Sequence, residues 1–194
     1  MILSERLSQY SNVEILRGDV LSIDVPEFNK IVSTPPYDIS SRLLLWVLKK
    51  HFDCTVLVLQ KEFANRLVAP VGSECYGWIT VVTYYHVEVE LLDDVPKSLF
   101  YPSPKVDSVI TRLIPKEAPL KLEIGDTGFK RLVQTLFTQR NRKVRNAVLP
   151  CVRGTRRMTK DTIEVVVEKL PFLDRRVREL SPEDFGVLAN ALKE

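Results

Sequence analysis

Short apolar runs rich in β-branched residues recur through the first 115 residues, and amphipathic patterns fill the rest of the chain. The runs at 12–19, 30–33 and 55–60 have the length and composition of buried strands. Between the second and third runs, apolar residues at helical spacing predict a helix within 40–52. Strand, helix and strand in this order predict a right-handed crossover and a parallel sheet. The stripe of the predicted helix consists of Leu43, Leu44, Val47 and Leu48.

The segment 76–96 favours strand by propensity, but about 20 residues are too many for one strand. We expect a helix near 77–85 followed by a strand near 87–93. The segment 105–115 alternates between apolar and polar positions and predicts a half-buried strand that ends at Pro115.

Beyond these strands the pattern is helical only. The segment 128–149 places apolar residues along one stripe of a helix. Thr159 is the candidate N-cap of a second helix, with Asp161 in its first turn. Ser181 is the candidate N-cap of a third helix, with Pro182 at its first position. We expect an α/β domain at 1–117 and a small all-α domain at 118–194. The stripes comprise Phe129, Leu132, Val133, Leu136, Phe137, Val144, Ala147 and Val148, and later Phe185, Leu188, Ala189 and Leu192.

Composition indicates a soluble globular protein, with 45% hydrophobic and 27% charged residues. No apolar run approaches the roughly 20 residues of a membrane span, and the first residues lack the pattern of a signal peptide. Three widely spaced cysteines, Cys54, Cys75 and Cys151, favour reduced thiols in the cytoplasm. With only two isolated histidines, we expect no metal site.

Positive charge is concentrated in one block. Between 130 and 160 the chain has ten basic residues and no acidic one, although the net charge is only +3. This segregation is typical of a polyanion-binding face. The alternative is a solvated helix face, which normally mixes charges of both signs. On one helix, Arg131, Thr138, Arg142 and Arg145 would share a face, and the candidate RNA-binding residues are Arg131, Arg140, Arg142, Lys143 and Arg145.

The sequence STPPY at 33–37 follows directly on the second predicted strand. Pro35 and Pro36 remove two backbone donors, so neither strand nor helix continues through them. In an open parallel sheet, ligands bind beyond the carboxyl ends of the strands. Asp19, after the first predicted strand, is a second candidate there, although an Asp after Gly18 is also typical of a plain turn.

The loop suits methyl transfer to an exocyclic amine. Such an amine is a weak nucleophile because its lone pair is delocalised into the ring. Acceptors at the two amine hydrogens, here the Thr34 hydroxyl and the Pro35 carbonyl, would favour a more reactive nitrogen and stabilise the charge that develops. Tyr37 would stack on the base. The alternative is a rigid turn with Tyr37 packed in the core, and the sequence leaves both interpretations open.

Longer motifs resemble the ribosomal RNA adenine N6,N6-dimethyltransferases (the KsgA group). The resemblance covers nearly the whole chain and includes NVEILRGDVLSIDVPEFNKIVSTPPY, VLVLQKEFANRLVAPVGSECYG, LFTQRNRKVRNAV and RVRELSPEDF. The phrase FYPSPKVDS at 100–108 is particularly specific. The resemblance implies a Rossmann-like class I methyltransferase fold, here incomplete at its N-terminus, followed by a small helical domain.

The resemblance also implies S-adenosylmethionine as methyl donor. It places Asp19, Val20 and Thr34 at the cofactor, Thr34, Pro35, Pro36 and Tyr37 in the catalytic loop, and Phe100 as a second aromatic beside the target base. Thr34 departs from the family, which usually has Asn there. We also expect the family's first strand, Gly-rich loop and ribose-binding acid to be missing, as in a truncated chain or one with a misassigned start codon. Weak cofactor binding and exposed apolar sheet edges, prone to aggregation, would follow.

The expected function is therefore dimethylation of adenine N6 in small-subunit ribosomal RNA, with a role in ribosome biogenesis, by a cytoplasmic monomer. A non-catalytic RNA-binding assembly factor derived from the same family is the alternative. A DNA amine methyltransferase is a third possibility, because TPPY also resembles the loop of those enzymes, but FYPSPKVDS and the helical tail favour the ribosomal group.

Overall fold

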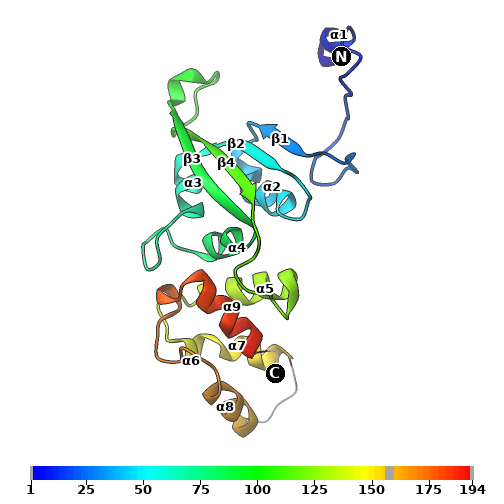
Figure 1. The fold of residues 1–194 in the computed structure, drawn as a ribbon. Helices are drawn as coiled ribbons and strands as arrows, with labels where there is room; N and C mark the ends of the chain where they lie inside the picture. Colours follow the sequence, from blue (N-terminus) through cyan, green and yellow to red (C-terminus); the bar gives the residue numbers. More distant parts are fainter. Residues whose placement is uncertain (1, 156–159, 193–194) are drawn as a thin grey trace.

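The computed structural model describes residues 2–155 and 160–192, and its elements are shown in Figure 1. The first part of the chain forms α1 (Ile2–Leu7), β1 (Lys30–Ser33), η1 (Tyr37–Ile39), α2 (Ser40–Val47), β2 (Cys54–Gln60), α3 (Lys61–Leu67), α4 (Trp78–His86), β3 (Val87–Val95), η2 (Lys97–Leu99) and β4 (Ser108–Pro115). The second part forms α5 (Gly125–Phe137), α6 (Val144–Ala147), α7 (Leu149–Thr155), α8 (Lys160–Glu168), η3 (Val177–Glu179) and α9 (Pro182–Ala191).

The four strands form one mixed sheet in the order β1-β2-β4-β3. β1 and β2 are parallel, with Ser33 opposite Leu57, which confirms the predicted crossover through α2. β4 runs antiparallel to both β2 and β3. Because Gln60 is opposite Ser108, the carboxyl ends of β1 and β2 lie at the same end of the sheet as the β3–β4 loop.

One face of the sheet packs on helices. Leu57 and Leu59 of β2 point to this face and are fully buried against residues of α2, α3 and α4. The residues that alternate with them point to the other face and remain half-exposed: Val56, Val58, Ile110 and Ile114. In the edge strand β1, Val32 is 82% exposed. Apolar side chains are therefore partly exposed on the open face and strongly exposed on the edge strand.

A second hydrophobic cluster lies among α5–α9, which Figure 1 shows gathered at the end of the sheet away from the β3–β4 loop. α4 contributes to both clusters, because Ile79 packs with the sheet while Val81 and Tyr85 pack with the helices. Within the second cluster, the hydroxyl of the buried Tyr76 donates to the Leu180 carbonyl at 2.8 Å and ties the segment between α3 and α4 to the residue before the N-cap of α9.

The predicted start of α9 is confirmed at its cap. The Ser181 side chain accepts from the Asp184 amide at 3.2 Å, and Pro182 occupies the first helical position of α9. Asp161 lies in the first turn of α8. The proposed cap at Thr159 falls outside the described residues.

Two predictions are wrong. Residues 12–19 form no strand, because their backbone has no ladder partner among the described strands and their side chains are exposed. The predicted continuous basic helix is interrupted, since α5 ends at Phe137 and the chain turns before α6 begins at Val144. Here the backbone bonds to a distant segment, for example from the Val144 amide to the Arg175 carbonyl at 2.9 Å. Tertiary partners thereby replace the i−4 carbonyls of a helix.

Candidate active site and basic surface

The Thr34–Tyr37 loop begins where β1 ends, as the two prolines predict. Thr34 and Pro36 are exposed, while Pro35 is buried and fixes the loop against the protein. The Ile39 amide donates to the Pro36 carbonyl at 3.2 Å and starts the short helix η1, which leads directly into α2. The loop is therefore held between a parallel strand and a helix, with Thr34 facing solvent at the carboxyl edge of the sheet.

Two oxygens of the loop are candidates to bind a ligand, one on the exposed Thr34 and one on the buried Pro35. Among the described residues, neither the Thr34 hydroxyl nor the Pro35 carbonyl takes part in an identified protein hydrogen bond. Adjacent acceptors of this kind suit the two hydrogens of an exocyclic amine. The binding of an amine by these two oxygens stays a prediction.

Tyr37 is tied to the start of β4. Its hydroxyl lies 2.6 Å from the Ser108 hydroxyl, 71 residues away in sequence. The residue is half-buried rather than part of either hydrophobic cluster. The hydroxyl is thus anchored, and stacking of the ring on a base stays a prediction.

Phe100 lies in the β3–β4 loop, at the same end of the sheet as Tyr37, and is half-buried. The aromatic contacts within the described part of the chain do not include a Tyr37–Phe100 pair. The two rings are brought to one edge of the sheet but not into contact with each other, and their role on either side of a base is a prediction.

Asp19 lies in a tight turn. Its Oδ1 accepts from the Leu21 amide at 3.0 Å, and its carbonyl accepts from the Ser22 and Ile23 amides at 2.9 Å. Gly18 is required beside it, because a Cβ there would lie 2.2 Å from Cγ2 of Ile23. The turn that sequence offered as the plain alternative is present. The carboxylate is nevertheless exposed, and Val20 packs beside the sheet cluster.

A cavity of about 410 Å³ lies at the opposite end of the sheet from these residues. It is lined by residues between the end of α2 and the start of α5, among them Lys50, His86, Lys116 and Asp126, and by none of the predicted site residues. Within residues 2–155 and 160–192, no group of three or more His, Cys, Asp or Glu side chains is arranged to hold a metal ion. No described helix is both long and apolar enough to cross a membrane.

The predicted RNA-binding residues have different environments. Arg131 lies on α5, whereas Arg140, Arg142 and Lys143 lie in the turn between α5 and α6, and Arg145 lies on α6. The Arg140 guanidinium donates to the Ser73 and Glu74 carbonyls, each at 2.9 Å. This fork joins the helical part to the loop between α3 and α4, so Arg140 has a structural role that the sequence did not indicate.

The sequence also missed three basic residues that lie beside this turn. Residues 173–178 run along the turn, with a bridge between Lys143 and Arg176 and a bond from the Arg178 amide to the Arg140 carbonyl at 3.0 Å. Arg175, Arg176 and Arg178 are exposed there. The motif RRVRE was visible in the sequence, but its pairing with the turn depends on tertiary structure. We call Arg142, Lys143, Arg145, Arg175, Arg176 and Arg178 the basic surface.

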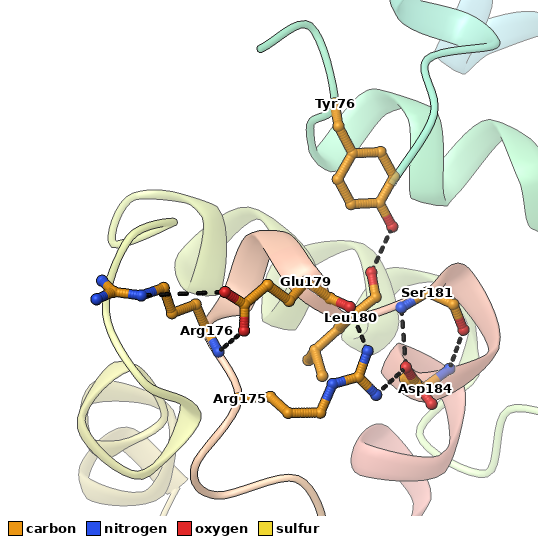
Figure 2. Close-up of polar contacts among 7 residues, drawn as sticks. All are labelled: Tyr76, Arg175, Arg176, Glu179, Leu180, Ser181 and Asp184. Carbon is orange, nitrogen blue, oxygen red and sulfur yellow. Dashed lines mark hydrogen bonds and ion pairs between the residues drawn. The ribbon is translucent and has the colours of Figure 1, made fainter. Parts of the chain in front are cut away.

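Acidic side chains engage part of the basic surface. Asp174 accepts from Lys143 at 3.2 Å and from Arg145 at 2.7 Å, and these cations lower the pKa of its carboxyl group, the Lys143 hydrogen bond most. Figure 2 shows Arg175 bonded to Asp184 at 2.7 Å and to the Glu179 carbonyl, and Arg176 beside the Glu179 carboxylate. Among the described contacts, Arg142 has no ion pair. It is the most available cation of the turn.

Solved structures identify the class of protein. The chain superposes with a TM-score of 0.82 on the crystal structure of a dimethyladenosine transferase from Plasmodium falciparum, at 28% identity over 96% of this chain and 75% of that one. The crystal structure of the 23S rRNA methyltransferase ErmE gives a TM-score of 0.63 at 26% identity, over 100% of this chain and 77% of that one. The protein therefore has a Rossmann-like methyltransferase fold.

Sequence comparisons then define the family. Residues 1–177 match the ribosomal RNA adenine dimethylase family. A relative from Methanosarcina acetivorans, named probable ribosomal RNA small subunit methyltransferase A, is 38% identical over 98% of this chain and 70% of its own length. A relative of the same name from Thermococcus sibiricus is 37% identical over 95% of this chain and 67% of its own. The chain belongs to the ribosomal RNA adenine dimethylase family, and it is a methyltransferase enzyme that acts on ribosomal RNA with a methyl donor.

Proposed function

We propose that the chain transfers methyl groups from S-adenosylmethionine to N6 of adenine in small-subunit ribosomal RNA, forming dimethyladenosine, with a role in ribosome biogenesis. The observation that carries this proposal is the Thr34–Tyr37 loop at the carboxyl end of a parallel strand, with two available acceptor oxygens. The names of the relatives supply the small subunit as the source of the RNA.

The loop's own residues orient and activate the amine. The Thr34 hydroxyl and the Pro35 carbonyl accept its two hydrogens, which draws the nitrogen toward a tetrahedral geometry and frees its lone pair. As the nitrogen gains positive charge, both oxygens stabilise it, so these contacts strengthen in the transition state. Tyr37 and Phe100 hold the extruded base between them, with Tyr37 fixed by Ser108. S-adenosylmethionine supplies an electrophilic methyl group when it is bound.

The residues fit the cofactor in one respect. The exposed Asp19 carboxylate has one oxygen outside the turn's hydrogen bond, which suits a hydroxyl or amine donor of a cofactor. Val20 offers apolar surface beside it, and Thr34 lies at the same carboxyl edge. With a single carboxylate contact, we expect this chain to bind S-adenosylmethionine more weakly than about 10 µM in a calorimetric titration. A tighter dissociation constant would contradict that expectation.

We further propose that residues 1–117 carry the chemistry and residues 118–194 engage RNA through the basic surface together with Arg131. The two hydrophobic clusters support this division, although α4 contributes to both. We propose that the protein acts as a monomer in the cytoplasm, where it meets the small ribosomal subunit. No metal ion is needed, because a sulfonium donor leaves as a neutral thioether.

A labelling experiment tests the function. The chain is incubated with S-adenosylmethionine carrying a tritiated methyl group and with small-subunit ribosomal RNA, and the digested RNA is analysed for N6,N6-dimethyladenosine. Large-subunit RNA is the matched control. We expect labelled dimethyladenosine from small-subunit RNA alone. RNA binding without any labelled adenosine would contradict the proposed activity of this chain.

A further inference from the structure

An aromatic side chain projects into solvent from the loop that connects β3 and β4. Tyr101 is 102% exposed and Leu99 is 74% exposed, although large apolar side chains are usually at least partly covered. Figure 1 shows this loop extending beyond the sheet at the end away from α5–α9. We call residues 96–106 the hairpin tip. An exposed apolar pair on a protruding loop indicates a contact surface.

The hairpin tip is held in a defined conformation. Its base is closed by a bond from the Lys97 amide to Oδ1 of Asp107 at 2.9 Å, and the Ser103 hydroxyl donates to the Lys97 carbonyl, also at 2.9 Å. Three prolines fix further backbone angles within the tip. Because the loop is restrained before binding, a ligand that contacts Tyr101 need not order it first.

The hairpin tip leads directly into the candidate active site. Ser108, which follows it after Asp107, holds the Tyr37 hydroxyl at 2.6 Å. The backbone at Phe100 is extended, with φ −106° and ψ 148°, so neighbouring side chains point to opposite sides. Phe100 is half-buried and Tyr101 faces solvent. Tyr101 thus lies on the solvent side of the loop, open to a base other than the one predicted to lie beside the half-buried Phe100.

Charge favours a polyanion at the tip. Residues 96–106 include Lys97 and Lys105 and no acidic residue. Asp107, at the base, has one carboxylate oxygen engaged by the Lys97 amide. Aromatic side chains beside cations are the usual components of a single-stranded nucleic-acid contact, in which bases stack and phosphates meet the cations.

We propose that Tyr101 stacks on an unpaired nucleotide that neighbours the target adenine in the RNA strand, with Lys97 and Lys105 close to its phosphates. This contact positions the strand and does not touch the reacting atoms. The inference rests on the proposed function, because it assumes that RNA reaches the Thr34–Tyr37 loop.

The first test measures binding without catalysis. The probe is a fluorescein-labelled, single-stranded RNA dodecamer with one central adenine, titrated with the full chain at one fixed salt concentration. Tyr101→Ala should weaken binding by about 5- to 150-fold, the range of one lost base stack. Tyr101→Phe should stay within about twofold of wild type. The matched control is Tyr10→Ala, which removes another exposed tyrosine from the N-terminal segment, and it should bind as wild type does.

The second test locates the stacked nucleotide. An abasic residue replaces each neighbour of the adenine in turn, and one of these changes should weaken binding to wild type but not to Tyr101→Ala, as expected when both changes remove one contact. Equal binding by Tyr101→Ala and wild type on every oligomer would overturn the inference. So would a defect seen only on assembled small-subunit particles, which would assign the tip to a protein. If the wild-type chain itself binds no RNA, the result contradicts the proposed function, and the inference about Tyr101 falls with it.

Discussion

The hydroxyl of Tyr37 lies 2.6 Å from the hydroxyl of Ser108 and ties the loop after β1 to the first residue of β4. This bond restrains the ring of Tyr37 at the carbon that carries the hydroxyl. The aromatic contacts of the described residues do not include the Tyr37 ring. Anchoring and stacking are therefore separable by mutation, because the first needs the hydroxyl and the second needs the ring.

Tyr37→Phe and Ser108→Ala should each lower methylation modestly, by less than about tenfold, since one hydrogen bond contributes about 1 kcal/mol. Tyr37→Ala should in addition lose about 1–3 kcal/mol of base stacking, while cofactor affinity stays nearly unchanged. Single-turnover methylation rates and RNA titrations would separate the two effects. If Tyr37→Phe is as impaired as Tyr37→Ala, the hydroxyl rather than the stack is the important feature.

Thr34→Val removes a hydroxyl at similar volume. We expect it to lower turnover more than RNA affinity, because the contact to the amine strengthens as charge develops on the nitrogen. Thr34→Asn should preserve or raise turnover, since the amide oxygen of Asn reaches further than the Thr hydroxyl and Asn is the residue that the family usually has at this position. Single-turnover methylation rates measure the first effect, and RNA dissociation constants measure the second. An unaltered rate for Thr34→Val would leave the Pro35 carbonyl as the sole acceptor.

Arg140 and Arg142 are two residues apart, and we expect substitutions at the two positions to change different properties of the protein. Arg140→Gln loses the fork to the Ser73 and Glu74 carbonyls, and we expect a loss of about 1–3 kcal/mol in the free energy of unfolding. Arg140→Lys should not restore it fully, because a lysine cannot form the fork. Arg142→Gln should leave stability unchanged and lower the slope of log affinity against log salt by about 0.7–0.9. Denaturant titration and salt-dependent RNA binding distinguish the two.

The difference between these arginines also shows what the sequence could not provide. Helical spacing identified α2, because this helix buries one face. The length and composition of short apolar runs identified β1 and β2, and the length limit of a strand separated α4 from β3. The break after Phe137 was missed because the turn's backbone bonds to residues 173–178, and long-range pairing leaves no local signal. The strand expected at 12–19 failed for the converse reason, since apolar pattern alone does not supply a ladder partner. The loop at Thr34–Tyr37 was recognisable as the end of β1 because prolines act locally.

Asp174 pairs with two cations of the basic surface, Lys143 and Arg145, and would compete for them with the phosphates of an RNA bound there. Replacing it by Asn should raise RNA affinity by up to about fivefold, the strength of an exposed ion pair. Lys143 and Arg145 hold the pKa of the carboxyl group below its usual value. The carboxylate therefore stays ionised from neutral pH down past the unfolded-state pKa, and its ion pairs are lost only as the pH falls further, through the lowered folded-state value. Between pH 5 and 8, the ratio of mutant to wild-type affinity should consequently be constant. A ratio that changes across this range would show that another group controls the effect.

The packing of α4 on α9 depends on the absence of a side chain at Gly186. A Cβ there would lie 1.9 Å from the hydroxyl of Tyr85, whose pKa burial raises to about 12. Gly186→Ala should destabilise the protein by about 1–3 kcal/mol, because both groups are buried and the overlap must move a helix or a ring. Tyr85→Phe in the same chain should recover part of this loss, since the ring carbon then becomes the nearest atom at 3.0 Å. Gly128→Ala, near the start of α5, where the added Cβ would lie 3.3 Å from the Cβ of Ile124, is the matched control and should change stability little. Thermal unfolding of the four variants measures the coupling, and additive effects of Gly186→Ala and Tyr85→Phe would show that the two positions do not meet in this way.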